Sequence, residues 1–236
     1  MKSLNNAEKV VITIILLFAT SLGVYSNTHE KITEDKSKLP SYVEDSPLFQ
    51  KWITNHKNKN INLEGDAFRL VEENEVYNSK RLKIYDASAP LIWQKYKDRL
   101  EIDVKKGVRF SESKIQLVDF RYETRYGLDG EEIRPNELWY LGLRNGRIIS
   151  NKLLACSEVK NCIHDRAFFI SEDIIVASEF SRNVEAGEGI VPPACGMAEL
   201  CEYTVKLYVM DIASNSNLVY QSPPIKLILA NKINGF

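Results

Sequence analysis

The residues of this chain best able to do chemistry, by type and spacing, are its four cysteines. They form two pairs, Cys156 with Cys162 and Cys195 with Cys201, and five residues separate the members of each pair. In an oxidising compartment such pairs predict disulfides, and four cysteines allow three connectivities. Pairing between the two segments would close rings of ~40 residues, which the chain-entropy account stabilises more than short rings. We favour pairing within each segment, because a five-residue loop can bring its ends together, and both arrangements stay open.

A metal site would have to combine some of these cysteines with His164. Structural zinc sites usually space their cysteines by about two to four residues and occur in reducing compartments, and neither condition is met here. Thiol redox chemistry needs a Cys-x-x-Cys pair or a single activated thiol, and the sequence has neither. It also lacks the motifs of a phosphate-binding loop, a dinucleotide site and a calcium loop. We therefore expect no metal site and no cofactor.

Acid–base catalysis would have to use His164, which Asp165 follows in the chain. The other histidines, His29 and His56, lie in polar segments. A Ser-His-Asp triad would need a serine on a Gly-x-Ser-x-Gly turn, and the sequence has no such turn. A hydrolase that uses carboxylates with His164, through Asp165 or Glu179, remains an alternative, but acidic surfaces offer such pairs routinely. The patterns favour a protein that is not an enzyme.

Residues suited to binding a protein partner occur in two places. One is the segment over residues 184–193, which is rich in glycine, proline and acidic residues. It predicts an accessible loop in which Glu185, Glu188 and Ile190 contact the partner. The other is Trp139 and Tyr140, because aromatic side chains near basic residues are common in binding hot spots. Aromatic residues are also common in β-sheet cores, and a core position is the favoured alternative for this second pair. The net charge of −1 argues against nucleic acid as a partner.

The N-terminal residues predict that the rest of the chain lies outside the cytoplasm. Residues 10–25 are apolar and uncharged and follow Lys2 and Lys9, which is the pattern of a secretory signal. This run is shorter than the ~20 residues of a comfortable membrane span, so residues 1–26 would be a cleaved signal peptide or an uncleaved anchor. The basic residues before the run predict that the body is outside, either periplasmic or secreted, or anchored to the inner membrane. The sequence contains no Asn-x-Ser/Thr glycosylation site, which fits a bacterial envelope.

The elements that would position these residues begin after a polar tether, which we expect over residues 27–46. Ser46 followed by Pro47 predicts the start of a short helix, with Ser46 as the N-cap and Pro47 in the first helical position. Phe49 and Trp52 would lie on the buried face of that helix. Residues 47–236 would form a single β-rich extracytoplasmic domain.

From residue 61 onward the pattern is mainly that of β-strands. Alternating apolar residues and regular turns predict about ten to twelve short strands. Asp129-Gly130 and Asn145-Gly146 are strong signals for tight hairpin turns. Alternation of apolar and charged residues also predicts a strand over residues 99–104. The expected fold class is therefore mostly β, an antiparallel β-sandwich-like domain, with a small β-propeller or a barrel as the alternative.

Together these features predict an extracytoplasmic binding or interaction protein of a bacterial envelope that acts by surface recognition. An inhibitor, an immunity-type protein or an accessory protein would have this organisation. The alternatives are the hydrolase and a membrane-tethered structural subunit of an envelope complex. The expected partner is a protein, and an uncleaved N-terminal segment would add contact with the membrane.

Overall fold

The structure is a computed structural model that describes residues 35–77, 81–85, 89–101, 103, 106–156, 162–182, 195–196 and 198–229. From Lys36 onward these residues belong to one compact unit. The predicted signal or anchor over residues 1–26 lies outside the described residues, as do residues 27–34 of the predicted tether. Within the described ranges, no helix combines the length and the apolar character that crossing a membrane requires.

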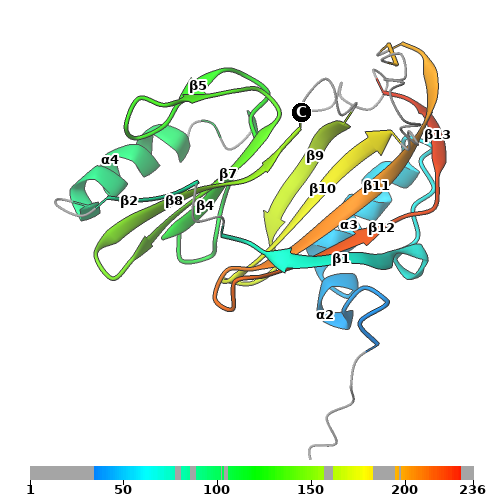
Figure 1. Cartoon of the computed structure of the whole chain (residues 1–236), viewed down its shortest axis with the longest axis horizontal. Coiled ribbons are helices and arrows are strands. Elements are labelled where there is room, and N and C mark those ends of the chain that lie inside the picture. The colour runs from blue at the N-terminus through cyan, green and yellow to red at the C-terminus, as the bar shows by residue number, and fades with distance from the viewer. Residues whose placement is uncertain are drawn as a thin grey trace, which may run out of the picture. The chain divides into compact units, whose positions relative to one another are not determined.

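The fold is mostly β, with 47% of residues in strands and three helices among the described residues. Every strand pair in the described chain is antiparallel, and the strands form two larger sheets and one small hairpin (Figure 1). The prediction of an antiparallel, sandwich-like β domain is confirmed.

The larger sheet, sheet A, has the strand order β1-β12-β11-β10-β9, and β13 pairs with the first residues of β11. A bulge lies between Ser178 and Glu179, where β10 pairs with β9. The strands are β1 (Arg69–Glu75), β9 (Cys162–Phe169), β10 (Ile174–Arg182), β11 (Leu200–Asp211), β12 (Ser216–Gln221) and β13 (Ile225–Ile228).

The second sheet, sheet B, has the order β2-β8-β7-β4-β3, and β5 with β6 forms a separate hairpin. The turn between β7 and β8 is Asn145-Gly146, as predicted, with φ angles of 52° and 73° that suit a tight primed turn. The strands are β2 (Leu82–Tyr85), β3 (Val108–Phe110), β4 (Gln116–Asp119), β5 (Arg125–Tyr126), β6 (Glu132–Ile133), β7 (Glu137–Arg144) and β8 (Arg147–Ala155).

The helices among the described residues are α2 (Ser41–Glu44), α3 (Pro47–Lys57) and α4 (Ala89–Glu101), and a 3-10 turn, η1, spans Gly65–Ala67. Helix α3 begins as predicted, because the Ser46 hydroxyl accepts a hydrogen bond of 3.1 Å from the backbone N–H of Phe49. The predicted tether differs from the structure over its last part. Leu39 and Val43 are buried in the same core as Phe49, so apolar packing begins before residue 47.

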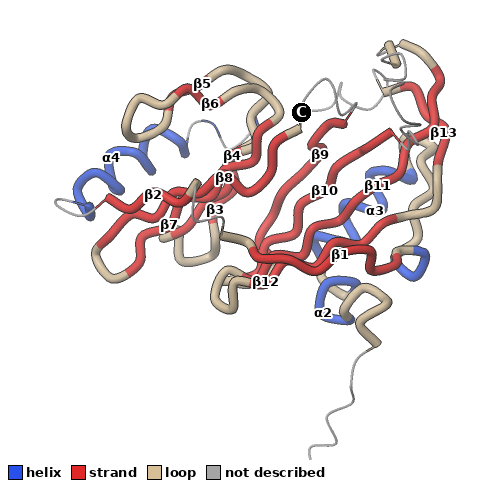
Figure 2. The backbone as a smooth tube through the Cα atoms, in the orientation of Figure 1, coloured by secondary structure: helices blue, strands red, loops and turns tan. Residues whose placement is uncertain are grey.

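Alternation along the strands produces three groups of buried side chains. One face of sheet A packs on α3, and one face of sheet B packs on α4 (Figure 2). A third group joins the two sheets, with Leu138 and Tyr140 of β7 among residues from β9 and β10. The strand predicted over residues 99–104 is wrong, because α4 runs to Glu101. Leu100 shares the helical spacing of Trp93 and Tyr96 and packs with them.

Candidate functional site

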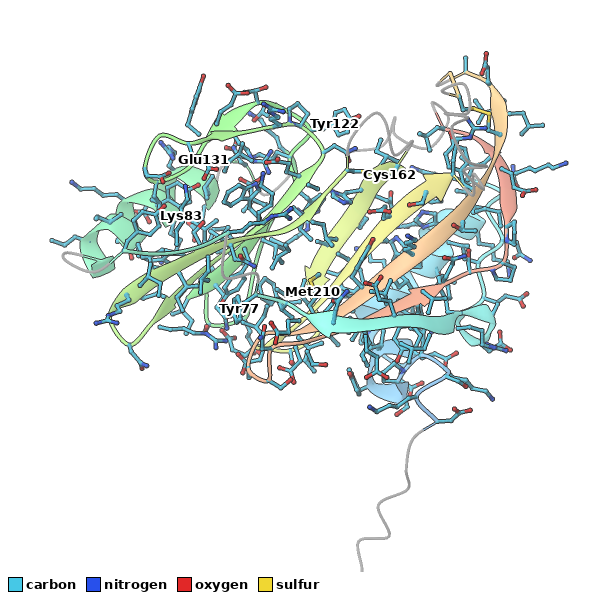
Figure 3. All side chains as sticks on the ribbon, in the orientation of Figure 1. Tyr77, Lys83, Tyr122, Glu131, Cys162 and Met210 are labelled. Carbon is cyan, nitrogen blue, oxygen red and sulfur yellow. A yellow bond between two sulfur atoms is a disulfide. The ribbon has the colours of Figure 1, made fainter. Side chains whose placement is uncertain are left out.

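The structure joins the cysteines within each segment. Cys156 is bonded to Cys162 and Cys195 to Cys201, with Cα–Cα separations of 5.6 Å and 6.5 Å. The prediction of two disulfides is confirmed, with the pairing that the short loops favoured. The first disulfide ties the residue after β8 to the first residue of β9, where Cys162 is labelled in Figure 3.

The predicted partner-binding residues divide into two groups. Glu185, Glu188 and Ile190 lie outside the described residues. Trp139 and Tyr140 are 3% and 0% exposed, so they occupy the core, the alternative that the sequence favoured, and do not present a binding surface. Being neighbours on β7, they face opposite sides of sheet B, Trp139 toward the α4 core and Tyr140 toward the core between the sheets.

His164 lies on β9 opposite Glu179 on β10, and this pair is the centre of a buried polar cluster. The His164 Nε2 atom is 3.3 Å from Oε2 of Glu179. Glu179 also accepts hydrogen bonds from the hydroxyls of Ser181 and Tyr208, the latter at 3.2 Å. We call these four residues the His164 cluster.

The pKa values within the His164 cluster follow from burial and from these contacts. Burial acts to raise the pKa of Glu179, but the contact with His164 and its charge, with smaller contributions from Ser181 and Lys206, hold that pKa below its ordinary value. Burial and the negative charge of Glu179 raise the pKa of Tyr208. The cluster therefore holds an ionised carboxylate beside a neutral phenol at neutral pH.

Two members of the His164 cluster, His164 and Glu179, also belong with Cys156 to a set of possible metal ligands. Cys156, His164 and Glu179 each place one ligand atom within 4.8 Å of the other two, although the Cys156 sulfur is in a disulfide. A second, more exposed set is formed by Cys195, Glu199 and Cys201, again with both sulfurs in a disulfide.

Asp165 lies on the opposite face of sheet A from His164, against α3. Its Oδ2 atom accepts a hydrogen bond of 2.8 Å from the Trp52 indole N–H and lies 3.4 Å from Nε2 of His56. The Ser178 hydroxyl donates to the same oxygen at 3.2 Å. Asp165 therefore fastens α3 to sheet A, and of the two acids considered as partners for His164 only Glu179 lies beside it.

A loop-rich segment over residues 121–134, which includes the β5–β6 hairpin, presents side chains to solvent. We call it the arm. Tyr122 and Tyr126 are 52% and 63% exposed, and Figure 3 shows Tyr122 on the outside of the ribbon. Near the tip, the Lys83 ammonium contacts the carboxylates of Asp129 at 2.7 Å and of Glu131.

Arg125 holds the base of the arm. Its Nε atom is 2.9 Å from Oδ2 of Asp119, and the side chain is 5% exposed. Its two terminal nitrogens donate hydrogen bonds to five backbone carbonyls, those of Asp119, Arg121, Glu123, Arg134 and Glu137. A buried guanidinium thus fixes both ends of the arm at once, which is a use of its several donors that lysine could not match.

The arm was not predicted as a site from the sequence, although a signal was present. The segment over residues 121–126 has the mixture of tyrosine and arginine that is typical of binding surfaces.

No family model, no curated protein and no solved structure matches the chain. The function of the chain therefore has to be inferred from the geometry of the arm, of the His164 cluster and of the contacts of Asp165.

Proposed function

We propose that this chain is an extracytoplasmic binding protein that recognises a protein partner through the arm. The observation that carries the proposal is the contrast within this segment: Arg125 is buried and holds the backbone, while Tyr122 and Tyr126 are more than half exposed. Association costs less when the binding segment is already ordered, because less conformational entropy is lost on binding. Tyrosine suits this role, since it offers a large contact area with few rotatable bonds.

The charges around the two tyrosines indicate the kind of surface that the arm would fit. Glu123, Glu132 and Arg134 have exposed side chains on the arm. A partner with apolar recesses for the two phenol rings and a mixed, mainly basic rim would complement these groups. An inhibitor, an immunity-type protein or an accessory protein of a bacterial envelope would use such a surface.

The location proposed for this activity is outside the cytoplasm. It is supported by the apolar, charge-free run over residues 10–25 and, more weakly, by two disulfides, which persist mainly in oxidising compartments. An intact-mass measurement on membrane and soluble envelope fractions tests this part. Loss of residues 1–26 indicates a secreted body, and a full-length chain in the membrane fraction indicates an anchored subunit of a larger complex.

The alternative of a hydrolase rests on His164 and Glu179, whose residue types can serve as a general base and its orienting acid and whose Nε2 and Oε2 atoms are 3.3 Å apart. Both side chains are less than 10% exposed, which favours recognition over catalysis. Replacing His164 with alanine separates the two ideas: a binding protein that still folds keeps its function, whereas this hydrolase would lose orders of magnitude in rate.

Site-specific cross-linking tests the binding proposal directly. A photoreactive residue placed at position 126 should form a discrete cross-linked product in cells, and the same residue at Tyr42 should not. Tyr42 is a matched control because it is also a surface tyrosine, 45% exposed, and lies in α2 and not in the arm. Equal products from both positions, or none from position 126, would refute the arm as the binding surface.

A further inference from the structure

His164 is a buried histidine with unused binding capacity. The residue is 6% exposed, yet neither ring nitrogen makes a hydrogen bond of acceptable geometry to any described residue. Burying polar atoms without hydrogen bonds costs free energy. A second feature lies beside it, since Cys156 begins the disulfide-bonded segment that leads into β9.

We propose that reduction of the Cys156–Cys162 disulfide creates a zinc site formed by Cys156, His164 and Glu179. One ligand atom of each residue already lies within 4.8 Å of the other two, and all three residues are buried. Thiolate, imidazole and carboxylate are the three ligand types that zinc takes in proteins. The zinc site does not depend on the binding function proposed for the arm.

The geometry of the two strands suits a tetrahedral ion. With zinc–nitrogen and zinc–oxygen bonds of about 2.0–2.1 Å, two ligand atoms in a tetrahedral site lie about 3.3 Å apart. The His164 Nε2 and Glu179 Oε2 atoms are 3.3 Å apart. Ser181 and Tyr208 both donate hydrogen bonds to Glu179 and so would orient its carboxylate, which is the usual role of groups behind a metal ligand.

The oxidised protein keeps this site closed, because a sulfur bonded to another sulfur has no thiolate charge to offer the metal. A dithiol reductant opens it. The disulfide and two thiol groups of the reductant exchange, leaving Cys156 and Cys162 as thiols and the reductant as a disulfide. Zinc then binds the Cys156 sulfur and releases its proton. The Cys162 thiol, which was bonded to Cys156, or a water molecule would complete the four ligands.

The test is a titration with zinc and cobalt of the full-length chain carrying Cys195→Ser and Cys201→Ser. These two substitutions remove the second set of sulfur ligands, so that one disulfide remains. A phosphine is the reductant, because dithiols themselves bind zinc. We expect the reduced protein to bind one zinc ion at least about 100-fold more tightly than the oxidised protein. Cobalt should give a thiolate charge-transfer absorption in the reduced protein and not in the oxidised protein.

Two further variants and one control variant separate the proposed site from chance binding by thiols. His164→Ala should weaken zinc binding by the reduced protein at least about tenfold, whereas replacing the exposed Lys226 with alanine should not change it. Cys162→Ser leaves the Cys156 thiol without a disulfide partner and should bind zinc without any reductant. The proposal is overturned if reduction does not tighten zinc binding, if His164→Ala binds as tightly as its parent, or if binding occurs only in chains that have lost their near-ultraviolet circular dichroism.

Discussion

The arm and the His164 cluster use their polar residues in opposite ways. In the arm, the charged side chain of Arg125 is inside and two tyrosines are outside. In the His164 cluster, the groups capable of catalysis are inside, and Glu179 is tied to its neighbours by hydrogen bonds. In this protein, buried ionisable side chains contact neighbouring strands and loops, whereas the rings of Tyr122 and Tyr126 are more than half exposed.

The two faces of sheet A differ in a similar way. His164 and Asp165 are adjacent in the chain, but their side chains lie on opposite faces. Asp165 receives hydrogen bonds from Trp52 and Ser178 and has a structural role. The His164 ring lies 3.3 Å from the Glu179 carboxylate, but neither ring nitrogen makes a hydrogen bond to any residue that the structure describes. These two adjacent, buried side chains therefore differ in how completely their polar atoms are hydrogen-bonded.

The substitution that should destabilise the protein most breaks the arm. Arg125→Ala removes the donor for five carbonyls and one partner of the buried Asp119 carboxylate. We expect a loss of about 3–5 kcal/mol in the free energy of unfolding, as for other buried pairs broken on one side. Urea denaturation measures it. The matched control is Arg134→Ala, whose side chain is 79% exposed, and a similar loss in both would contradict the account.

The next effect concerns the opposite face of sheet A. Asp165→Asn keeps the size of the side chain but removes the charge beside His56 and weakens the hydrogen bond with Trp52. We expect a loss of about 3 kcal/mol, because the remaining buried polar groups lose a charged partner. Chemical denaturation measures this loss, and Asp45→Asn on an exposed position serves as the control. Equal stability of the two variants would show that Asp165 does not fasten α3.

The pH dependence of stability probes the same contact. Burial acts to raise the pKa of Asp165, but the hydrogen bond and charge of His56, with the Trp52 N–H, hold it below its ordinary value. A carboxyl group whose pKa is lower in the folded state stabilises the fold above its unfolded pKa of about 3.9. That contribution is lost as the pH falls through the lower, folded pKa. Denaturation from about pH 6 down to about pH 2 should show this loss, and Asp165→Asn should reduce the slope.

A smaller effect is expected from the second disulfide. Replacing Cys195 and Cys201 together with serine opens a short ring, for which the chain-entropy account gives about 2 kcal/mol. The protein should still fold, because its three groups of buried side chains do not depend on this bond. Thermal unfolding with far-ultraviolet circular dichroism checks both statements, and an unfolded double variant would contradict them.

The smallest effect on stability is expected for the two exposed tyrosines of the arm, whose replacement should have the largest effect on binding. Replacing Tyr122 and Tyr126 together with serine should change the free energy of unfolding by no more than about 0.5 kcal/mol, as for most surface substitutions. Differential scanning calorimetry measures this. A loss of several kcal/mol would mean that the tyrosines belong to the fold and would remove the contrast with Arg125.

The sequence predicted correctly those helix starts and turns that depend only on neighbouring residues. Ser46-Pro47 marked the start of α3, and Asn145-Gly146 marked a hairpin, because caps and tight turns depend on neighbouring residues. Leu100 was placed in a strand because its alternation with charged residues competed with the helical spacing that links it to Trp93. A short apolar pattern fits both the two-residue period of a strand and the roughly 3.6-residue period of a helix. Packing against sheet B decides between helix and strand for this segment.

The site depends on contacts that the sequence does not display. Arg125 reaches the carbonyl of Glu137, twelve residues away, and His164 meets Glu179 through the register of β9 and β10. The sequence predicts that His56 lies in a polar segment. In the structure it lies in α3 beside Asp165, which is 109 residues further along the chain. Exposure is also decided by tertiary structure, so Trp139 and the tyrosines of the arm could not be distinguished by composition.

The most direct test of recognition through the arm uses the partner that cross-linking captures. Its dissociation constant is measured with three purified proteins. They are the parent chain, the variant with Tyr122→Ser and Tyr126→Ser, and a control with Tyr42→Ser. The account predicts that the double variant binds at least about 100-fold more weakly, since two hot-spot side chains are lost at about 1.4 kcal/mol or more each. The control should bind as the parent does. Unchanged affinity in a folded double variant would contradict recognition through the arm.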